Sequence, residues 1–261
     1  MMTKYIPLSD YAKHMQIQKG DTIFISSDAK TMLLDALENE SDMNLNLFID
    51  GLLQAVGNEG TVVFPTYNWD FCKGKTFSYL KTKCKTGALG DIALKRSDFL
   101  RTKHPIYSFA VWGKYSDKLL ALENKDSFGN NSPFQFFHEN NVINYVIDVP
   151  LNHCFTFAHY VEQASGVADY RYIKEFKAEY IDDLGESTMR TYTMFVRDLD
   201  RDVVSLVDPI EGDLIKAGAE SKFTINNSSM KRIEMGKAFS VLMDDMINNN
   251  GKKLCRYKGQ K

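Results

Sequence analysis

The residues best suited to chemistry lie between positions 151 and 162, where His153, Cys154, His159 and Glu162 follow an apolar segment. If a helix begins at the threonine three residues before His159, then His159 and Glu162 stand at i and i+3 on one helix face. A carboxylate at that spacing can orient an imidazole and support its charged form, as a general base requires. The spacing therefore favours a His159–Glu162 dyad. A hydrogen-bonded core histidine beside a solvated glutamate fits the same spacing and stays open.

Polar residues also follow the first two apolar runs of the chain. Ser26 and Ser27 come after one run and before a helical segment, and Thr66 comes after the next run. Open α/β sheets bind ligands at the carboxyl ends of their strands, where hydroxyls and free backbone N–H groups can hold a phosphate. The two serines are also ordinary helix caps. Tyr67 and Trp69 come next in the sequence. Their rings can stack on a ligand, or they can pack in the core.

A third signal is His104, which precedes Pro105. Proline holds the residue before it away from helical geometry, and the residues after it alternate as a strand does. His104 is therefore displayed on a rigid bend. A histidine at such a bend is often only a structural hydrogen-bonding residue, so a share in catalysis stays an alternative for His104.

These side chains need a scaffold, and short apolar runs that alternate with amphipathic segments predict strands connected by helices. The expected strands are Thr22–Ile25, Thr61–Phe64, Phe109–Trp112 and Val142–Val149. The expected helices are Met32–Leu37, Leu45–Val56, which Gly57 ends, and Met235–Ile247. After Ala168, Tyr192–Val196 and Val203–Leu206 alternate like antiparallel strands.

We therefore expect an α/β fold, with a central, largely parallel or mixed sheet, flanking helices and a small antiparallel β element in the C-terminal part. Residues 1–261 are expected to form a single domain. A covering loop is expected near 68–85, and a C-terminal β/α portion from about 169.

Composition excludes several classes of protein. The chain has 261 residues, 44% of them hydrophobic, with 32 Lys and Arg against 34 Asp and Glu. This balance argues against nucleic acid and against an anionic membrane surface as partners. The four cysteines form no C-x-x-C pair, the first residues lack the apolar core of a signal peptide, and no apolar run is long enough to span a bilayer. We expect a soluble, cytoplasmic protein without a metal-ligand cluster.

Six short motifs, in order, resemble the antibiotic N-acetyltransferase family, which includes the aminoglycoside N-acetyltransferases that are not built on the GNAT fold. The motifs are Gly-Asp and an apolar run into Ser-Ser, Gly-Thr-x-x-x-Pro-Thr, Thr-Gly-x-Leu, His-Pro-x-x-Ser, Ser-Pro and Thr-x-x-His-x-x-Glu. In this chain they stand at Gly20–Ser27, Gly60–Thr66, Thr86–Leu89, His104–Ser108, Ser132–Pro133 and Thr156–Glu162.

The resemblance implies transfer of an acyl group from acyl-CoA to a primary amine, with coenzyme A lying along the strand ends. The donor is acetyl-CoA or a longer or hydroxylated acyl-CoA, and no metal is expected. His159 matches the family histidine proposed to activate the amine, and Glu162 matches its acidic partner. The residues expected to bind the cofactor are Ser26, Ser27, Lys30, Thr66 and Ser108.

The chain departs from the family at two places. Ile25 stands where the family has a histidine, and Asn152 and His153 stand where an aspartate is common. We expect His153 to take over part of the role of that aspartate. Cys154 offers a competing covalent route, because a thiolate beside a histidine can carry an acyl group. A free cysteine next to a strand is more often buried and inert.

The acceptor is harder to predict. A polycationic aminoglycoside suits a strongly acidic cleft, whereas the covering loop carries several lysines that suit an anionic ligand. Alternatively, these lysines serve only the solubility of the protein. These are Lys73, Lys75, Lys81, Lys83 and Lys85. The aromatic residues expected to stack on a base or sugar are Tyr67, Trp69, Phe71 and Tyr79.

We therefore expect an N-acyltransferase that acts on a nucleotide-linked deoxyamino sugar, as members of the family do in the synthesis of surface polysaccharides. Aminoglycoside acetylation on the same fold is the first alternative. A non-catalytic CoA-binding or nucleotide-binding protein is the alternative of another class. Whether the chain forms a homodimer stays open.

Overall fold

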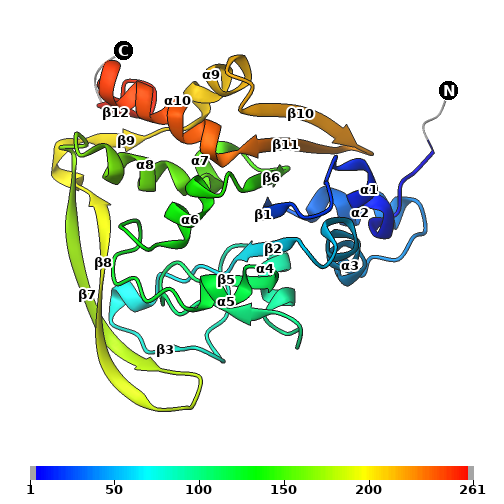
Figure 1. The fold of residues 1–261 in the computed structure, drawn as a ribbon, viewed down its shortest axis with the longest axis horizontal. Coiled ribbons are helices and arrows are strands. Elements are labelled where there is room, and N and C mark those ends of the chain that lie inside the picture. The colour runs from blue at the N-terminus through cyan, green and yellow to red at the C-terminus, as the bar shows by residue number, and fades with distance from the viewer. Residues whose placement is uncertain (1–3, 258–261) are drawn as a thin grey trace.

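The computed structural model describes residues 4–257, and Figure 1 labels its elements. The strands are β1 (Thr22–Ser27), β2 (Thr61–Pro65), β3 (Phe77–Ser78), β4 (Leu100–Arg101), β5 (Phe109–Gly113), β6 (Ile143–Ile147), β7 (Arg171–Ile181), β8 (Ser187–Arg197), β9 (Val203–Ser205), β10 (Glu220–Ile225), β11 (Ser228–Glu234) and β12 (Cys255–Tyr257). The α-helices are α1 (Tyr11–His14), α2 (Lys30–Glu38), α3 (Leu45–Val56), α4 (Ala88–Ala93), α5 (Ser116–Leu120), α6 (Pro133–Glu139), α7 (Leu151–Cys154), α8 (Phe157–Ser165), α9 (Glu211–Lys216) and α10 (Met235–Asn248). The 3₁₀ turns are η1 (Leu8–Asp10), η2 (Phe71–Lys73), η3 (Leu199–Arg201) and η4 (Asp208–Ile210).

Within the described residues, the main sheet has the strand order β10-β11-β6-β1-β2-β5-β4. Strands β6, β1 and β2 are parallel at its centre, and the outer strands join antiparallel. Every residue of β2 and of β6 is buried. Their mostly apolar sequences, with Thr61 and Asn144 as buried polar exceptions, fit this position, since strands covered on both faces lose the alternation of apolar and polar residues. The expected α/β fold is confirmed, and its sheet is mixed.

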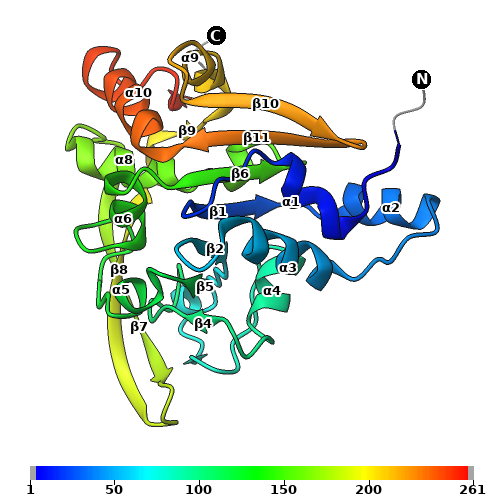
Figure 2. The same ribbon diagram turned by 45° about the vertical axis from the view of Figure 1, so that its right-hand side comes forward.

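Side chains of the central strands alternate between two apolar cores, one on each face of the sheet. Phe24 of β1 belongs to the core that α6, α8 and α10 cover, whereas Ile23 and Ile25 belong to the core that α1, α2 and α3 cover. Figure 2 shows these two groups of helices on opposite sides of the sheet. Helix α3 has the predicted bounds and ends at Gly57, whose φ of 67° suits glycine.

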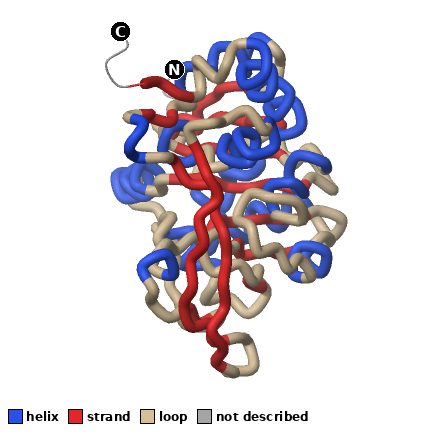
Figure 3. The backbone as a smooth tube through the Cα atoms, turned by 90° about the vertical axis from the view of Figure 1, so that its left-hand side faces the viewer, coloured by secondary structure: helices blue, strands red, loops and turns tan. Residues whose placement is uncertain are grey.

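A long hairpin of β7 and β8 runs along one side of the molecule, as Figures 1 and 3 show. The two strands pair along their whole length, from Arg171 opposite Arg197 to Ile181 opposite Ser187. The expected C-terminal antiparallel element is therefore present, and it is longer than the alternating segment 192–196 indicated. The covering segment 68–85 contains η2 and β3, and β3 pairs with β7.

The first strand extends past its predicted end. Ser26 and Ser27, expected to follow the strand, pair with Val146 and Ile147 of β6. This places the two serines at the carboxyl edge of the parallel centre. No helix in the described part of the chain is long and apolar enough to cross a membrane.

Candidate active site

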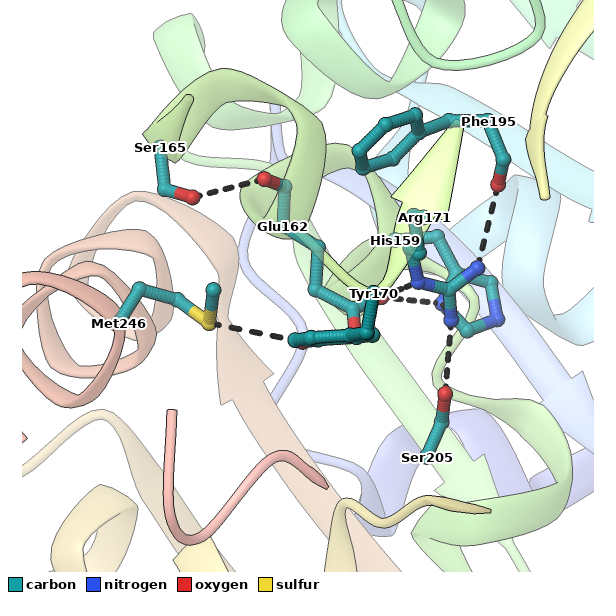
Figure 4. Close-up of polar contacts among 8 residues, drawn as sticks. All are labelled: His159, Glu162, Ser165, Tyr170, Arg171, Phe195, Ser205 and Met246. Carbon is teal, nitrogen blue, oxygen red and sulfur yellow. Dashed lines mark hydrogen bonds and ion pairs between the residues drawn. The ribbon is translucent and has the colours of Figure 1, made fainter. Parts of the chain in front are cut away.

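Helix α8 carries His159 and Glu162, and it begins after Thr156, as the spacing predicted. Phe157 and Val161 of this helix pack into the core, which leaves His159 half-buried on the adjoining face. Nδ1 of His159 lies 2.8 Å from Oε2 of Glu162 (Figure 4). The predicted i and i+3 relationship is therefore a direct contact between the two side chains.

The Glu162 carboxylate is held from several sides although it is only 1% exposed. The Tyr170 hydroxyl donates to its Oε1 at 2.7 Å, and Nε of Arg171 forms an ion pair with its Oε2 at 2.9 Å. Burial raises the pKa of Glu162, but the hydrogen bond from His159 and the charge of Arg171 outweigh burial, and the pKa lies below its ordinary value. Glu162 is a buried carboxylate, so the solvated glutamate of the alternative interpretation is not what the structure contains.

Arg171, at the start of β7, is a member of this group that no sequence motif indicated. Its Nη1 donates to the Phe195 carbonyl at 3.1 Å, its Nη2 donates to Oγ of Ser205 at 2.7 Å, and Nη2 also lies 2.9 Å from Nδ1 of His159. Nδ1 of His159 therefore faces both an acceptor and a cation. For a neutral ring, Nδ1 either donates a hydrogen to Glu162 or accepts one from Nη2 of Arg171, and the first arrangement leaves Nε2 of His159 free to accept a proton. In Figure 4 that nitrogen points away from Glu162.

Two cavities open at this site. The hairpin cavity, of about 540 Å³, is lined by His159 and Arg171 and by side chains of β7 and β8. The strand-end cavity, of about 690 Å³, is lined by residues at the carboxyl ends of β1 and β2 and by the first turns of α2. Both volumes are typical of small-molecule sites. The side chains that line both cavities are Trp69, His153, Cys154 and Thr156. The cavities thus share one wall, and His159 lies on the hairpin side of it.

The strand-end cavity contains three of the residues expected to bind the cofactor. Ser26, Ser27 and Lys30 all line it. Oγ of Ser26 contacts Oδ1 of Asn144 at 3.2 Å, and Ser27 and Lys30 reach the cavity from the end of β1 and the start of α2. The apolar part of its wall comes from Leu33, Leu34, Met43 and Val149. The wall therefore combines hydroxyl groups, an ammonium group and an apolar surface.

Thr66 and Ser108, the other two expected cofactor residues, are fully buried and line neither cavity. Their hydroxyl groups contact each other at 2.8 Å, and Nε of Arg101 donates to Oγ of Ser108 at 3.0 Å. This network joins β2, β4 and β5. We therefore treat the two residues as supports of the strand ends and not as ligand contacts.

The four aromatic residues of the covering segment are placed differently. Tyr67 and Trp69 line the strand-end cavity, and Trp69 also lines the hairpin cavity. Phe71 is buried against the Tyr192 ring, with centroids 5.6 Å apart. The Tyr79 hydroxyl donates to the Arg101 carbonyl. Phe71 and Tyr79, expected to bind substrate, are therefore absent from both cavity walls.

His104 is buried and lines neither cavity. Its Nδ1 accepts from the backbone N–H groups of Ile106 at 3.2 Å and Tyr107 at 3.1 Å, and its Nε2 lies 3.4 Å from Oγ of Ser127. Burial lowers the pKa of His104 to about 3, so the ring is neutral. The structure agrees with the structural alternative, and we leave His104 out of the candidate catalytic group.

His153 and Cys154 lie on α7 at the shared wall. His153 is exposed, and its neighbour Asn152 is held by Asp208 of η4, whose Oδ1 accepts from the Asn152 backbone N–H at 3.1 Å. Burial raises the pKa of the Cys154 thiol to about 12. Little thiolate is then present at neutral pH, which weighs against the covalent route.

Among the lysines of the covering segment, Lys85 lines the strand-end cavity and forms an ion pair with Asp70 at 2.7 Å. Lys75 lies 3.6 Å from the same carboxylate. The lysines that line neither cavity are Lys73, Lys75, Lys81 and Lys83. Within residues 4–257, no group of three or more His, Cys, Asp and Glu side chains could hold a metal ion.

Comparison with known proteins places this geometry in context. Residues 34–246 match the family model described as aminoglycoside 3-N-acetyltransferase. The chain is 23% identical over 178 residues to the SPbeta prophage-derived aminoglycoside N(3')-acetyltransferase-like protein YokD of Bacillus subtilis (strain 168). That match covers 59% of this chain and 63% of the relative, which is under two thirds of its length.

Solved structures share the fold at low sequence identity. Aminoglycoside acetyltransferase AAC(3)-Xa superposes with a TM-score of 0.74 at 17% identity, covering 95% of this chain and 92% of that chain. AAC-IIIb in its binary complex with CoASH gives 0.76 at 15% identity, covering 94% and 98%. The YokD protein from Bacillus subtilis gives 0.75 at 18% identity, covering 97% of each chain.

Proposed function

The chain belongs to the aminoglycoside 3-N-acetyltransferase family, and from this premise we propose that it is an acyl-CoA-dependent N-acyltransferase that acts on a primary amine. One observation carries the proposal. Two cavities of ligand size meet at a shared wall beside the buried His159–Glu162 pair. A transferase that joins two substrates directly needs two such binding sites and a base between them.

The donor is assigned to the strand-end cavity. Its hydroxyl groups and Lys30 suit phosphate and amide groups, and its apolar wall suits the methylenes of a pantetheine arm. The solved structure of AAC-IIIb is a binary complex with CoASH, which supports an acyl-CoA as the donor. A donor in the strand-end cavity would bring its thioester to the shared wall of Trp69, His153 and Cys154. The acceptor amine is expected on the other side of this wall, in the hairpin cavity.

His159 acts as the general base of the proposed reaction. Glu162 accepts the Nδ1 hydrogen of His159, so Nε2 takes a proton from the acceptor nitrogen as that nitrogen attacks the thioester carbon. The new C–N bond forms, the C–S bond breaks, and the coenzyme leaves as its thiolate, which the proton held by His159 can neutralise. The buried charge of Glu162 stabilises the imidazolium that forms.

We propose a nucleotide-linked deoxyamino sugar for surface polysaccharides as the acceptor. Among the described residues that line the hairpin cavity, Arg171, Lys174 and Arg197 are cationic and none is Asp or Glu. A polycationic aminoglycoside would be repelled by such a wall, whereas the phosphates of a nucleotide would be attracted. The aromatic side chains of Tyr172 and Phe176 on the same wall can stack on a base or a sugar.

The runner-up is aminoglycoside acetylation, which the family description itself favours. Sisomicin is bound to one solved relative of the same fold, AAC-VIa. A non-catalytic CoA-binding or nucleotide-binding protein would have the same cavities without turnover.

One assay separates the three functions. Release of free thiol is followed with acetyl-CoA and longer acyl-CoAs against panels of free amino sugars, nucleotide-linked amino sugars and aminoglycosides. The proposal expects the highest kcat/KM for a nucleotide-linked amino sugar. Preference for aminoglycosides would establish the runner-up. Binding of CoA without thiol release from any panel member would establish the non-catalytic function.

A further inference from the structure

We propose that Lys174 and Arg197 form a subsite for the diphosphate of the acceptor on the β7–β8 wall of the hairpin cavity. The inference rests on the proposed function, because it assigns the charged part of the acceptor to the cavity that holds His159. It goes further by naming the residues that select an anionic acceptor over a neutral or cationic one.

Arg197 is the main reason for this assignment. It is half-buried on the cavity wall, and its buried Nε has no hydrogen-bond partner in the described structure. A guanidinium group cannot lose its proton in a protein, so Arg197 keeps its charge, and its buried Nε is left without an acceptor within the described part of the chain. Arg171, directly opposite on β7, has its charge neutralised by Glu162. Arg197 is therefore the arginine of this wall whose charge is left for a ligand.

Lys174 adds a second cation to the same wall. Its Nζ lies 5.7 Å from the centre of the Phe176 ring, and no described carboxylate forms an ion pair with it. Elsewhere on the hairpin, Arg190 has a carboxylate partner in Asp182. Unlike Arg190, Lys174 and Arg197 have no carboxylate partner among the described residues. Both line a cavity that has no Asp or Glu among its described lining residues.

Lys174 and Arg197 both line the hairpin cavity. Arg197 pairs with Arg171, and Lys174 lies three residues further along β7, about 10 Å away at about 3.3 Å per residue. Side chains three residues apart on a strand leave opposite faces, so it is the shared cavity and not the strand register that puts Lys174 and Arg197 near one ligand. A guanidinium fork and an ammonium group are the side chains typical of diphosphate recognition.

Coenzyme A also carries a diphosphate, so its phosphates are the competing source of the same chemistry. The observations favour the acceptor, because Ser26, Ser27 and Lys30 offer polar groups in the other cavity, beyond the shared wall. The experiment separates the two sources by measuring diphosphate binding with the coenzyme already bound.

The variants are Lys174→Gln, Arg197→Gln and the double substitution. Lys177→Gln is the matched control, because Lys177 lies on the same strand, is exposed and lines neither cavity. Uridine and thymidine diphosphate are titrated by calorimetry into protein saturated with CoA. Each lost charged contact is expected to raise the Kd of the diphosphate about tenfold to a hundredfold, whereas Lys177→Gln should leave it unchanged.

The kinetic measurement compares a nucleotide-linked amino sugar with the same sugar lacking the nucleotide. KM should rise in the double variant for the linked sugar only, and KM for acyl-CoA should not change. Equal KM increases for both sugars, an increase for acyl-CoA, or unchanged diphosphate affinity would overturn the inference.

Failure of the subsite and failure of the proposed function give different results. The subsite alone is refuted if the wild-type protein turns over a nucleotide-linked amino sugar and the substitutions leave the Kd of the diphosphate unchanged. Diphosphate binding that is lost in the double variant, in a protein that releases no thiol with any amine, refutes the proposed function and leaves the subsite standing.

Discussion

Nη2 of Arg171 lies 2.9 Å from Nδ1 of His159, the same ring nitrogen that lies 2.8 Å from Glu162. A cation and an anion therefore act on one imidazole from adjacent positions. Both contacts hold the ring in place, and each charge can be removed separately.

Replacing Arg171 with Gln should lower kcat, because the Glu162 carboxylate loses its ion pair and the His159 ring loses a neighbour that fixes its position. Arg171→Lys keeps the charge and should lose less. Initial rates at saturating substrate test both variants, with circular dichroism as the control for folding. An unchanged kcat in Arg171→Gln would show that Arg171 only supports the fold.

Glu162→Gln should also lower kcat, because the imidazolium that forms loses its carboxylate partner; the loss should be smaller than in His159→Ala. The substitution also leaves Arg171 without its counter-ion, so Tm should decrease. Circular dichroism is the control for folding, and an unchanged kcat in a folded Glu162→Gln protein would refute the role of Glu162.

The strand-end serines should control donor affinity. The Ser26→Ala, Ser27→Ala double variant should bind CoA more weakly, by roughly 1.5–3 kcal/mol for each lost contact to a charged phosphate. Apparent KM should rise much more for acyl-CoA than for the amine. Ser108→Ala serves as the contrast, because Ser108 is buried between Thr66 and Arg101 and should lower Tm rather than donor affinity. Equal CoA affinity of the double variant and the wild type in calorimetry would remove the serines from the donor site.

His104 should affect stability and not catalysis. His104→Ala leaves the N–H groups of Ile106 and Tyr107 without their acceptor, at a cost of about 1–3 kcal/mol in the free energy of unfolding. Asn can replace the accepting nitrogen, so His104→Asn should be milder, and kcat should hold in both variants.

The pH dependence of this effect has a definite sign. Burial lowers the pKa of His104 from 6.5 to about 3. The stability contributed by the neutral ring is therefore present above pH 6.5 and is lost as pH falls toward 3. The Tm difference between wild type and His104→Ala should shrink over that interval, as thermal unfolding at several pH values would reveal. A large loss of kcat in a folded His104→Asn protein would return His104 to the catalytic group.

The sequence predicted the parts of the site that depend on local spacing. The i and i+3 relationship of His159 and Glu162 follows from helical geometry alone, and Ser26 and Ser27 lie at a strand end that the apolar pattern marks. Arg171 could not be found in this way, because β7 brings it to His159 through tertiary packing. Thr66 shows the same dependence on tertiary packing. The sequence predicted its position at a strand end, but neighbouring strands bury its side chain, and local spacing cannot show this.

The mechanism depends most on His159. His159→Ala should lower kcat by about 10²–10⁴, because the acceptor nitrogen loses the group that removes its proton, while the Kd of CoA should hardly change. Cys154→Ala should stay active, since burial raises the pKa of that thiol to about 12 and direct transfer does not need a thiolate. Initial-rate kinetics should give a sequential pattern, with both substrates bound before product leaves. Near-normal kcat in His159→Ala would move the role of general base to another residue such as His153. An acyl group found on Cys154 by mass spectrometry would replace direct transfer with the covalent route.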